Sequence, residues 1–209
     1  MLAALALIPF VVMMATSFVK ISVVLSIVKN ALGTQQIPPA AVITGLSVVL
    51  TIYIMGPVGT RMYEDAKASF ENRSKTFSAG SIDDLADAME AGKGPLKNFL
   101  KNNAGEQELT MLAELAVKRW GSTTAVSPTD MIVLVPAFVL TQLREGFRIG
   151  FLIFVPFLVI DLVIVNVLLA LGMGMLPPMT ITMPLKILIF VMSDGWALLA
   201  RGLVESFKG

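Results

Sequence analysis

Long apolar stretches alternate with a single polar segment along this chain. Four stretches approach or exceed the roughly 20 residues needed to cross a bilayer core, and they cover residues 2–28, 40–58, 149–171 and 181–204. A short loop separates the two members of each pair. The pattern therefore predicts four hydrophobic helices, arranged as two hairpins in an all-α, membrane-associated fold.

The first hairpin turns within KNALGTQQIPP, residues 29–39. Gly33 suits the end of a helix, where a left-handed backbone is often needed. Pro38 and Pro39 mark the start of the next helix, because proline fits the first helical turn.

The second hairpin turns within LALGMGMLPPMTITMP, residues 169–184. Pro177 and Pro178 remove two backbone donors and disfavour helical geometry in the residue before them, so the incoming helix should end near Leu176. Glycine and proline account for a turn. The several methionines in the same stretch do not follow from turn chemistry.

Most of the charged side chains lie between the hairpins, in residues 61–130. We predict that this segment is helical and lies outside the membrane. SIDDLADAME should begin a helix with Ser81 as its N-cap, and ELTMLAELAVKRW places apolar residues on one helical face. AGKGP and NNAGE are predicted turns.

Three parts follow: an N-terminal hairpin in residues 1–60, the polar segment in 61–130 and a C-terminal hairpin in 131–209. The short loops carry Lys29 and little acid, so the positive-inside rule favours cytoplasmic hairpin tips and a polar segment that faces outward. The N-terminus lacks the basic leading region and the small-residue cleavage site of a secretory signal peptide, so we expect it to be retained.

Composition narrows the possible chemistry. With 56% hydrophobic and 15% charged residues, the chain has the composition of a membrane protein. It has no cysteine and no histidine, which removes disulfides, thiolate nucleophiles, the commonest metal ligand and the commonest general base. A near-zero net charge without a basic run argues against nucleic acid as a partner. These absences exclude much familiar enzyme chemistry, and we expect no metal and no cofactor.

Lys20 lies within the first apolar stretch, where an isolated charge is costly. Asp161 and Asp194, in the third and fourth apolar stretches, are its candidate counter-charges. The three residues could form a proton or ion relay. Scattered charges without histidine make a poor relay, so the sequence favours structural pairing between helices.

Two further groups of residues are candidates for contacts, one with a polar partner surface and one between closely packed helices. Within LREGFR, Arg144, Glu145 and Arg148 could bind a polar partner surface, or Glu145 and Arg148 could form an ion pair on a solvated helix turn. The sequence favours neither. The small residues that allow close helix approach, a common device in membrane bundles, are Gly45, Ser47, Gly56 and Gly59.

Several long motifs resemble those of one family. PAFVLTQLREGFRIGF (residues 136–151) and VPFLVIDLVIVNVLLALGMGMLPP (residues 155–178) are similar to the signature segments of the bacterial type III secretion export-gate family, called FliP in flagella and SctR in injectisomes. The resemblance extends over both hairpins through TSFVKISVVLSIVKNALGTQQIPP and MTITMPLKILIFVMSDGW. Residues 61–130 carry no matching signature.

The resemblance implies a subunit of a protein-export pore rather than an enzyme. In that family, five copies assemble with S, T and Q-type export subunits into a helical, cone-shaped complex within the secretion base, at the bacterial inner membrane and largely on its periplasmic side. Unfolded secreted polypeptides pass through this complex. Helices that look transmembrane by hydropathy can then be buried in the assembly instead. The missing signal peptide and the motif NALGTQQIPP favour the injectisome branch.

The resemblance also implies a role for the methionines. Members of the family carry a run of methionines in the second loop, and the copies together form a gasket that closes the pore. The matching positions here are Met173, Gly174 and Met175, so a glycine replaces the middle methionine, and Leu176 could fill the missing volume. Flexible thioethers can pack together and can also adapt to a passing chain. The residues expected to shape the loop are Gly172, Gly174, Pro177 and Pro178.

Two alternative functions use some of the same residues. A proton-coupled secondary transporter would place Lys20 and Asp161 at broken helix ends, although the chain shows no repeat of transporter size. An intramembrane enzyme would need Asp161 and Asp194 as paired aspartates, and no motif supports that pairing.

Overall fold

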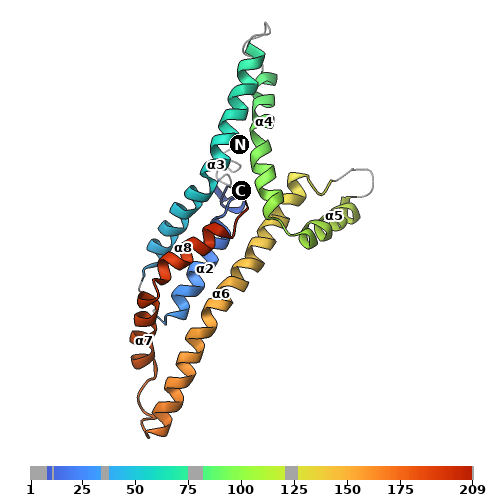
Figure 1. Ribbon diagram of the computed structural model, residues 1–209. Coiled ribbons are helices and arrows are strands. Elements are labelled where there is room, and N and C mark those ends of the chain that lie inside the picture. The colour runs from blue at the N-terminus through green and yellow to red at the C-terminus, as the bar shows by residue number, and fades with distance from the viewer. Residues whose placement is uncertain (1–8, 11, 34–37, 75–81, 121–126, 209) are drawn as a thin grey trace. The chain divides into compact units, whose positions relative to one another are not determined.

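The computed structural model describes residues 9–10, 12–33, 38–74, 82–120 and 127–208. All regular secondary structure in these ranges is helical (Figure 1), as the predicted all-α class requires. The elements are α2 (Phe18–Ala31), α3 (Ala40–Ser74), α4 (Ile82–Asn103), α5 (Glu106–Trp120), α6 (Met131–Ala170), α7 (Met179–Met192) and α8 (Gly195–Glu205).

The chain forms two compact units. The first comprises Met1–Ser17, Ile52–Gln142 and Phe207–Gly209, and the second comprises Phe18–Thr51 and Leu143–Ser206. The division falls within α3 and within α6, so each of these helices contributes one part to each unit.

In the first unit, α3 and α4 lie side by side as a hairpin (Figure 1), and Gly92 of α4 faces Ala66 and the carbonyl of Met62. Its core is a cluster of buried apolar side chains from α4 and α6. The ring of Phe99 packs at a tilt against Phe138, with centroids 5.8 Å apart. Burial of these large apolar side chains is the main stabilising contribution to the unit.

In the second unit, α2 packs closely against α6. Two glycines of α6 make the approach possible. A Cβ at Gly150 would overlap the side chain of Ile27 and lie 3.0 Å from its Cβ, and a Cβ at Gly146 would lie 3.3 Å from Cγ1 of Val23. Since Val23 and Ile27 are one helical turn apart, as are the two glycines, small residues on one helix receive branched residues of the other.

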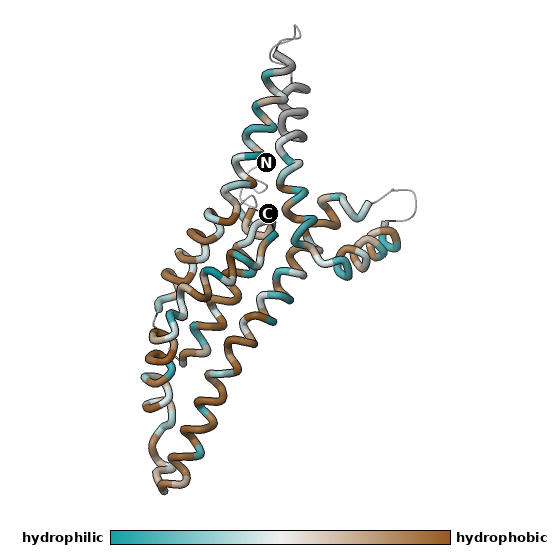
Figure 2. The backbone as a smooth tube through the Cα atoms, viewed as in Figure 1, coloured by the Kyte–Doolittle hydropathy of each residue, from teal (hydrophilic) through white to brown (hydrophobic). Residues whose placement is uncertain are grey.

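Two helical stretches, Ala40–Ser69 of α3 and the whole of α6, are long and apolar enough to cross a membrane. Helices α7 and α8 pass the same test only as a pair, with a 62° bend between them. Helix α2 has 14 residues, short of the roughly 20 needed for a crossing. Figure 2 shows the apolar character of α6 and α7. The division at residues 60 and 130, and the side of the membrane that each part faces, stay predictions.

The helix boundaries correct the four predicted helices. The first apolar stretch is interrupted by a turn at residues 15–17, before α2 begins, and the fourth is broken at Ser193 and Asp194. Helix α3 continues past residue 58 and α6 begins well before residue 149. Hydropathy marks where apolar residues stop, whereas a helix ends where its backbone hydrogen bonds stop.

Two of the predicted turns are confirmed and one is wrong. Gly33 has φ 78° after the end of α2, and Pro39 accepts the first hydrogen bond of α3 from Val42, as predicted. NNAGE forms the break between α4 and α5, which confirms that turn. AGKGP is not a turn, because α4 runs through it with Pro95 inside the helix. The predicted N-cap Ser81 lies outside the described residues.

Candidate functional site: the methionine hairpin

The methionine loop begins where a glycine ends α6. Gly172 has φ 72°, a left-handed conformation that glycine adopts without strain. The amide of Met173 donates to the carbonyl of Leu168 (2.9 Å), and the amide of Gly172 donates to that of Leu169 (3.1 Å). This pair of bonds is the Schellman motif, which satisfies the last carbonyls of a helix. The helix therefore ends at Ala170, earlier than the prolines predicted.

A tight turn follows, in which the amide of Leu176 donates to the carbonyl of Met173 (3.0 Å). Gly174, inside this turn, does not have positive φ. A Cβ at this position would meet only Leu169, at an ordinary contact distance of 3.7 Å. The backbone of this loop therefore requires glycine at position 172 but not at position 174.

Pro178 then starts α7. It occupies the N-cap position with helical φ and ψ, and its carbonyl accepts from the amide of Thr182 (3.0 Å). Pro177 accepts from the amide of Thr180 (3.1 Å). The two prolines thus begin the second helix of the hairpin and do not end the first.

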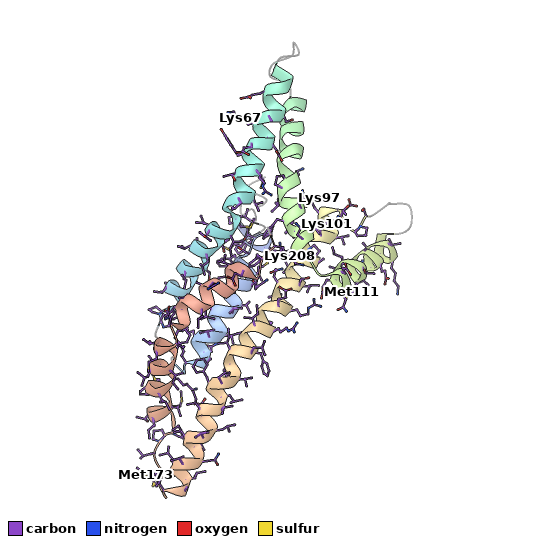
Figure 3. The ribbon with its side chains drawn as sticks, in the orientation of Figure 1. Lys67, Lys97, Lys101, Met111, Met173 and Lys208 are labelled. Atoms are coloured by element: carbon purple, nitrogen blue, oxygen red, sulfur yellow. The ribbon has the colours of Figure 1, made fainter. Side chains whose placement is uncertain are left out.

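The loop presents its apolar side chains outward. Met175 is fully exposed, and Met173 and Leu176 are each more than 40% exposed. Figure 3 shows Met173 at the tip of the hairpin that α6 and α7 form. An exposed apolar cluster of this kind is a mark of a contact surface.

An ion pair joins the two helices behind the loop. Nζ of Lys186 on α7 lies 2.5 Å from Oδ2 of Asp161 on α6, and it donates a second bond to the carbonyl of Ala31 at the end of α2 (3.1 Å). Lys186 is buried. The rings of Phe157 and Phe190 meet one turn further from the loop, with centroids 6.4 Å apart. These contacts hold the hairpin together and fix the direction from which the loop emerges.

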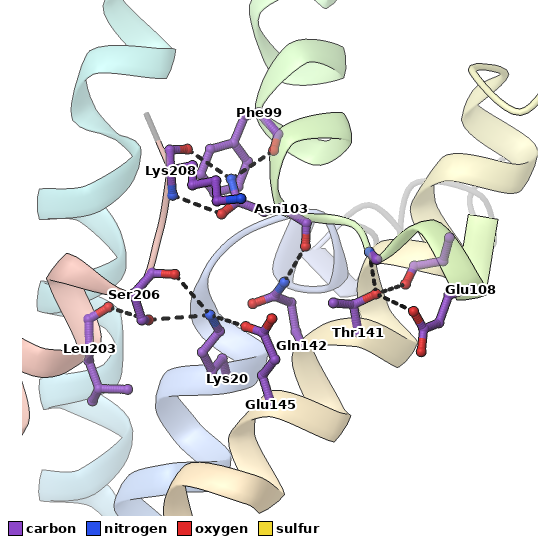
Figure 4. A network of polar contacts seen from close by, with 12 residues as sticks. Lys20, Phe99, Asn103, Glu108, Thr141, Gln142, Glu145, Leu203, Ser206 and Lys208 are labelled. Atoms are coloured by element: carbon purple, nitrogen blue, oxygen red, sulfur yellow. Dashed lines mark hydrogen bonds and ion pairs between the residues drawn. The ribbon is translucent and has the colours of Figure 1, made fainter. Parts of the chain in front are cut away.

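Lys20 has a different partner from the two predicted (Figure 4). Its Nζ lies 2.7 Å from Oε2 of Glu145 and donates to Ser206, at 3.2 Å to Oγ and 3.4 Å to the backbone oxygen. The side chain of Lys20 is completely buried. Burial lowers the pKa of Lys20, while the hydrogen bond and the charge of Glu145 act in the opposite direction.

These contacts correct the sequence-based pairing. Asp161 and Asp194 are not the counter-charges of Lys20: Glu145 is, and Asp161 pairs with Lys186. The Lys20–Asp161 site that a transporter would need is not formed. The alternative ion pair between Glu145 and Arg148 is not formed either, because Glu145 turns to Lys20. Structural pairing between helices, favoured from the sequence, is what the structure contains.

Asp194 lies at the break between α7 and α8. It has φ 53° and ψ 43°, the one left-handed non-glycine among the described residues, and its side chain does not cap α8. Arg144 and Arg148 of the predicted patch are exposed on α6. A Cβ added at Gly45, Gly56 or Gly59 of α3 would meet no atom of the described residues within 4 Å, so the predicted close approach is not made among those residues. Ser47 is buried and bonds the carbonyl of Ile43.

Sequence reasoning missed Lys186, Gly146 and Gly150. Lys186 carried the same signal as Lys20, a lysine within an apolar stretch. Gly146 and Gly150 have the spacing of a small-residue packing motif. In the described part of the chain, no group of three or more acidic, histidine or cysteine side chains is placed to hold a metal ion.

Comparison with known proteins identifies the group to which the chain is related. The model of the FliP family matches residues 1–203. The chain belongs to the FliP family. It is 41% identical over 210 residues to the Yop proteins translocation protein R of Yersinia pestis, covering 100% of this chain and 94% of that protein. It is 41% identical over 208 residues to the harpin secretion protein HrcR of Erwinia amylovora, covering 99% and 93%.

A flagellar member of the FliP family is also similar. The flagellar biosynthetic protein FliP of Pectobacterium carotovorum is 40% identical over 208 residues, covering 99% of this chain and 76% of that protein. The family assigned from the motifs is therefore confirmed. The Yersinia and Erwinia relatives favour the injectisome branch that the sequence suggested.

Proposed function

We propose that this chain is a core subunit of a type III secretion export gate. Its relatives are named for translocation, harpin secretion and flagellar biosynthesis, which supports a place in the secretion apparatus. In this proposal, five copies join S, T and Q-type subunits in the secretion base. The complex lies at the bacterial inner membrane, extends to the periplasmic side, passes unfolded polypeptides and has no enzyme activity.

The exposed methionine loop is the observation that carries the proposal. Thioether side chains are long, unbranched and polarizable, so those of neighbouring copies can pack against one another when no substrate is present. The same side chains can rearrange around a passing polypeptide of any sequence. Leu176, also exposed, lies beside the two methionines and adds apolar volume where the sequence has Gly174. A ring of these loops would form the closed state of the pore.

Ion conductance tests the gasket directly. The complex of this chain with its partner subunits is reconstituted in planar bilayers, with the wild type compared with Met173→Ala/Met175→Ala. We expect the double variant to conduct small ions while the wild type stays closed. Met111→Ala is the matched control, since Met111 is also exposed but lies on α5. Unchanged conductance in an assembled double variant would rule out the gasket.

Native mass spectrometry tests the assembly itself. The detergent-extracted protein is measured alone and with the S, T and Q-type subunits. A five-copy species that binds these subunits is expected. A stable monomer or dimer under both conditions would contradict a shared pore.

A further inference from the structure

Asp194 is a charged residue in surroundings that are otherwise apolar. Its side chain is exposed, and it has no hydrogen-bonding or ionic partner among the described residues. Its neighbours Met192 and Leu198 are exposed apolar residues, and the α7–α8 pair is apolar enough to form a broken span. A carboxylate in lipid or in an apolar interface is costly unless a cation meets it. The carboxylate of Asp194 therefore needs a cationic partner from outside the second unit.

An apolar cleft lies next to the bend that contains Asp194. It has a volume of about 440 Å³ and is lined by side chains of α6 on one side and of the α7–α8 bend on the other, among them Leu152, Pro156, Phe190 and Leu198. Ser193 and Gly195 also line it, so Asp194, between them, stands at its rim. A cleft of this size accepts one or two large apolar side chains.

A complementary surface lies on α6, one turn toward its N-terminus. Phe147 and Phe151 are 60% and 64% exposed, which is unusual for phenylalanine. Arg148, between them in sequence, is exposed and has no ionic partner in the described part of the chain. At about 100° per residue, these three side chains share one face of α6, and the cleft residues of α6 lie on roughly the opposite face.

We propose that these two surfaces bind each other in adjacent copies of the chain. Phe147 and Phe151 of one copy enter the cleft of the next copy, and the guanidinium of Arg148 pairs with the carboxylate of Asp194. The contact joins two different surfaces, so it is heterologous, and successive copies close into a ring or continue as a helix. This inference rests on the proposed multi-copy export gate and supplies one of its interfaces.

Charge complementarity decides between a second copy and a lipid as the occupant of the cleft. An acyl chain would fill the apolar volume, but it would leave the carboxylate of Asp194 and the guanidinium of Arg148 without partners. A second copy satisfies the cleft and both charges in one contact. A desolvated arginine–carboxylate pair also fixes orientation, because both groups are planar and bond in a defined geometry.

Disulfide cross-linking tests the contact, and the chain suits it because it has no cysteine of its own. A tagged Phe151→Cys copy and a differently tagged Ser193→Cys copy are assembled together in the full complex and oxidised. We expect a disulfide-linked pair that carries both tags. Val49→Cys replaces Phe151→Cys in the control, since Val49 is comparably exposed at 62% but lies on α3; it should not cross-link.

Charge reversal provides a second, independent measurement. Asp194→Arg or Arg148→Asp alone should lower the assembled fraction at least tenfold in native mass spectra, whereas the double reversal should restore most of it. A folding defect from Asp194→Arg would not be rescued by Arg148→Asp. Asp194→Asn, which keeps a residue that tolerates the left-handed backbone, should weaken assembly in the same direction.

The outcomes separate this contact from the proposed function. Five-copy assembly without the cross-link, or single reversals that assemble normally, would overturn the contact and leave the export gate standing. A lipid retained in the mass spectrum, together with no cross-link, would assign the cleft to an acyl chain and overturn the contact as well. Failure of the wild type to form any multi-copy species would remove both proposals.

Discussion

The two sides of α6 in the second unit have opposite roles. On one side, Gly146 and Gly150 receive Val23 and Ile27 of α2 so closely that an added Cβ would meet them. About 100° around the helix from these glycines, Phe147 and Phe151 are the next residues in sequence, and most of their surface is exposed. The chain fills the first side with its own helix and leaves the second side open. Residues one position apart in an apolar segment therefore serve different purposes.

This difference gives a rule for substitutions. Changes on the α2-facing side should lower the free energy of unfolding of the single chain. Changes on the open side should leave that free energy unchanged and act on assembly instead.

The largest effect is expected for Glu145→Ala, on the α2-facing side. The substitution leaves the buried ammonium of Lys20 without its carboxylate. Because the side chain of Glu145 is itself 41% exposed, we expect a loss at the lower end of the range for buried ion pairs, about 3 kcal/mol. Thermal unfolding of the monomer in detergent measures the change. Arg148→Ala on the open side is the control and should change stability by about 0.5 kcal/mol or less. Equal losses for both variants would break the comparison.

Gly150→Leu should have the next largest effect. The new side chain overlaps Ile27, and overpacking of this kind costs about 2 kcal/mol. The same unfolding measurement applies. Phe151→Leu, one residue along and exposed, should be nearly neutral in the monomer. A tolerated Gly150→Leu would show that α2 does not need its close approach to α6.

The smallest effect on stability is expected for Gly174→Met, at the tip of the hairpin. The backbone of Gly174 is not left-handed and its Cβ position is open, so the monomer should change by about 0.5 kcal/mol or less. Combined with Met173→Ala/Met175→Ala, the same variant should lower the ion conductance of that double variant, since it returns one thioether to each loop. A matched Gly172→Met should destabilise the loop, because Gly172 has positive φ. Similar stability losses for both variants would contradict the loop geometry.

The sequence predicted correctly those features that depend on the local residue types. Long apolar stretches predicted helices, Gly33 marked a helix end, and a lysine within an apolar stretch predicted a buried ion pair. These features are local, because they depend on backbone sterics and on the cost of burying charge. The family motifs then placed the methionines in the loop where the structure has them exposed.

The sequence did not show which residues from distant parts of the chain come into contact. Lys20 meets Glu145, 125 positions away, only because α2 lies along α6, and no local pattern encodes that alignment. The break at Asp194 was missed because a left-handed aspartate leaves no signal in hydropathy. The predicted end of α6 was too late because it was taken from the two prolines. The helix ends earlier, where Gly172 and Met173 form the hydrogen bonds of the Schellman motif.

The bond from Lys186 to the carbonyl of Ala31 has a consequence for biosynthesis. A ribosome produces α2 first, α6 much later and Lys186 near the end of the chain. The ammonium of Lys186 therefore cannot reach both of its partners, Asp161 on α6 and the carbonyl of Ala31, until the two earlier helices have come together. We expect the methionine loop, which lies between Asp161 and Lys186 in the sequence, to take its final position only after that step.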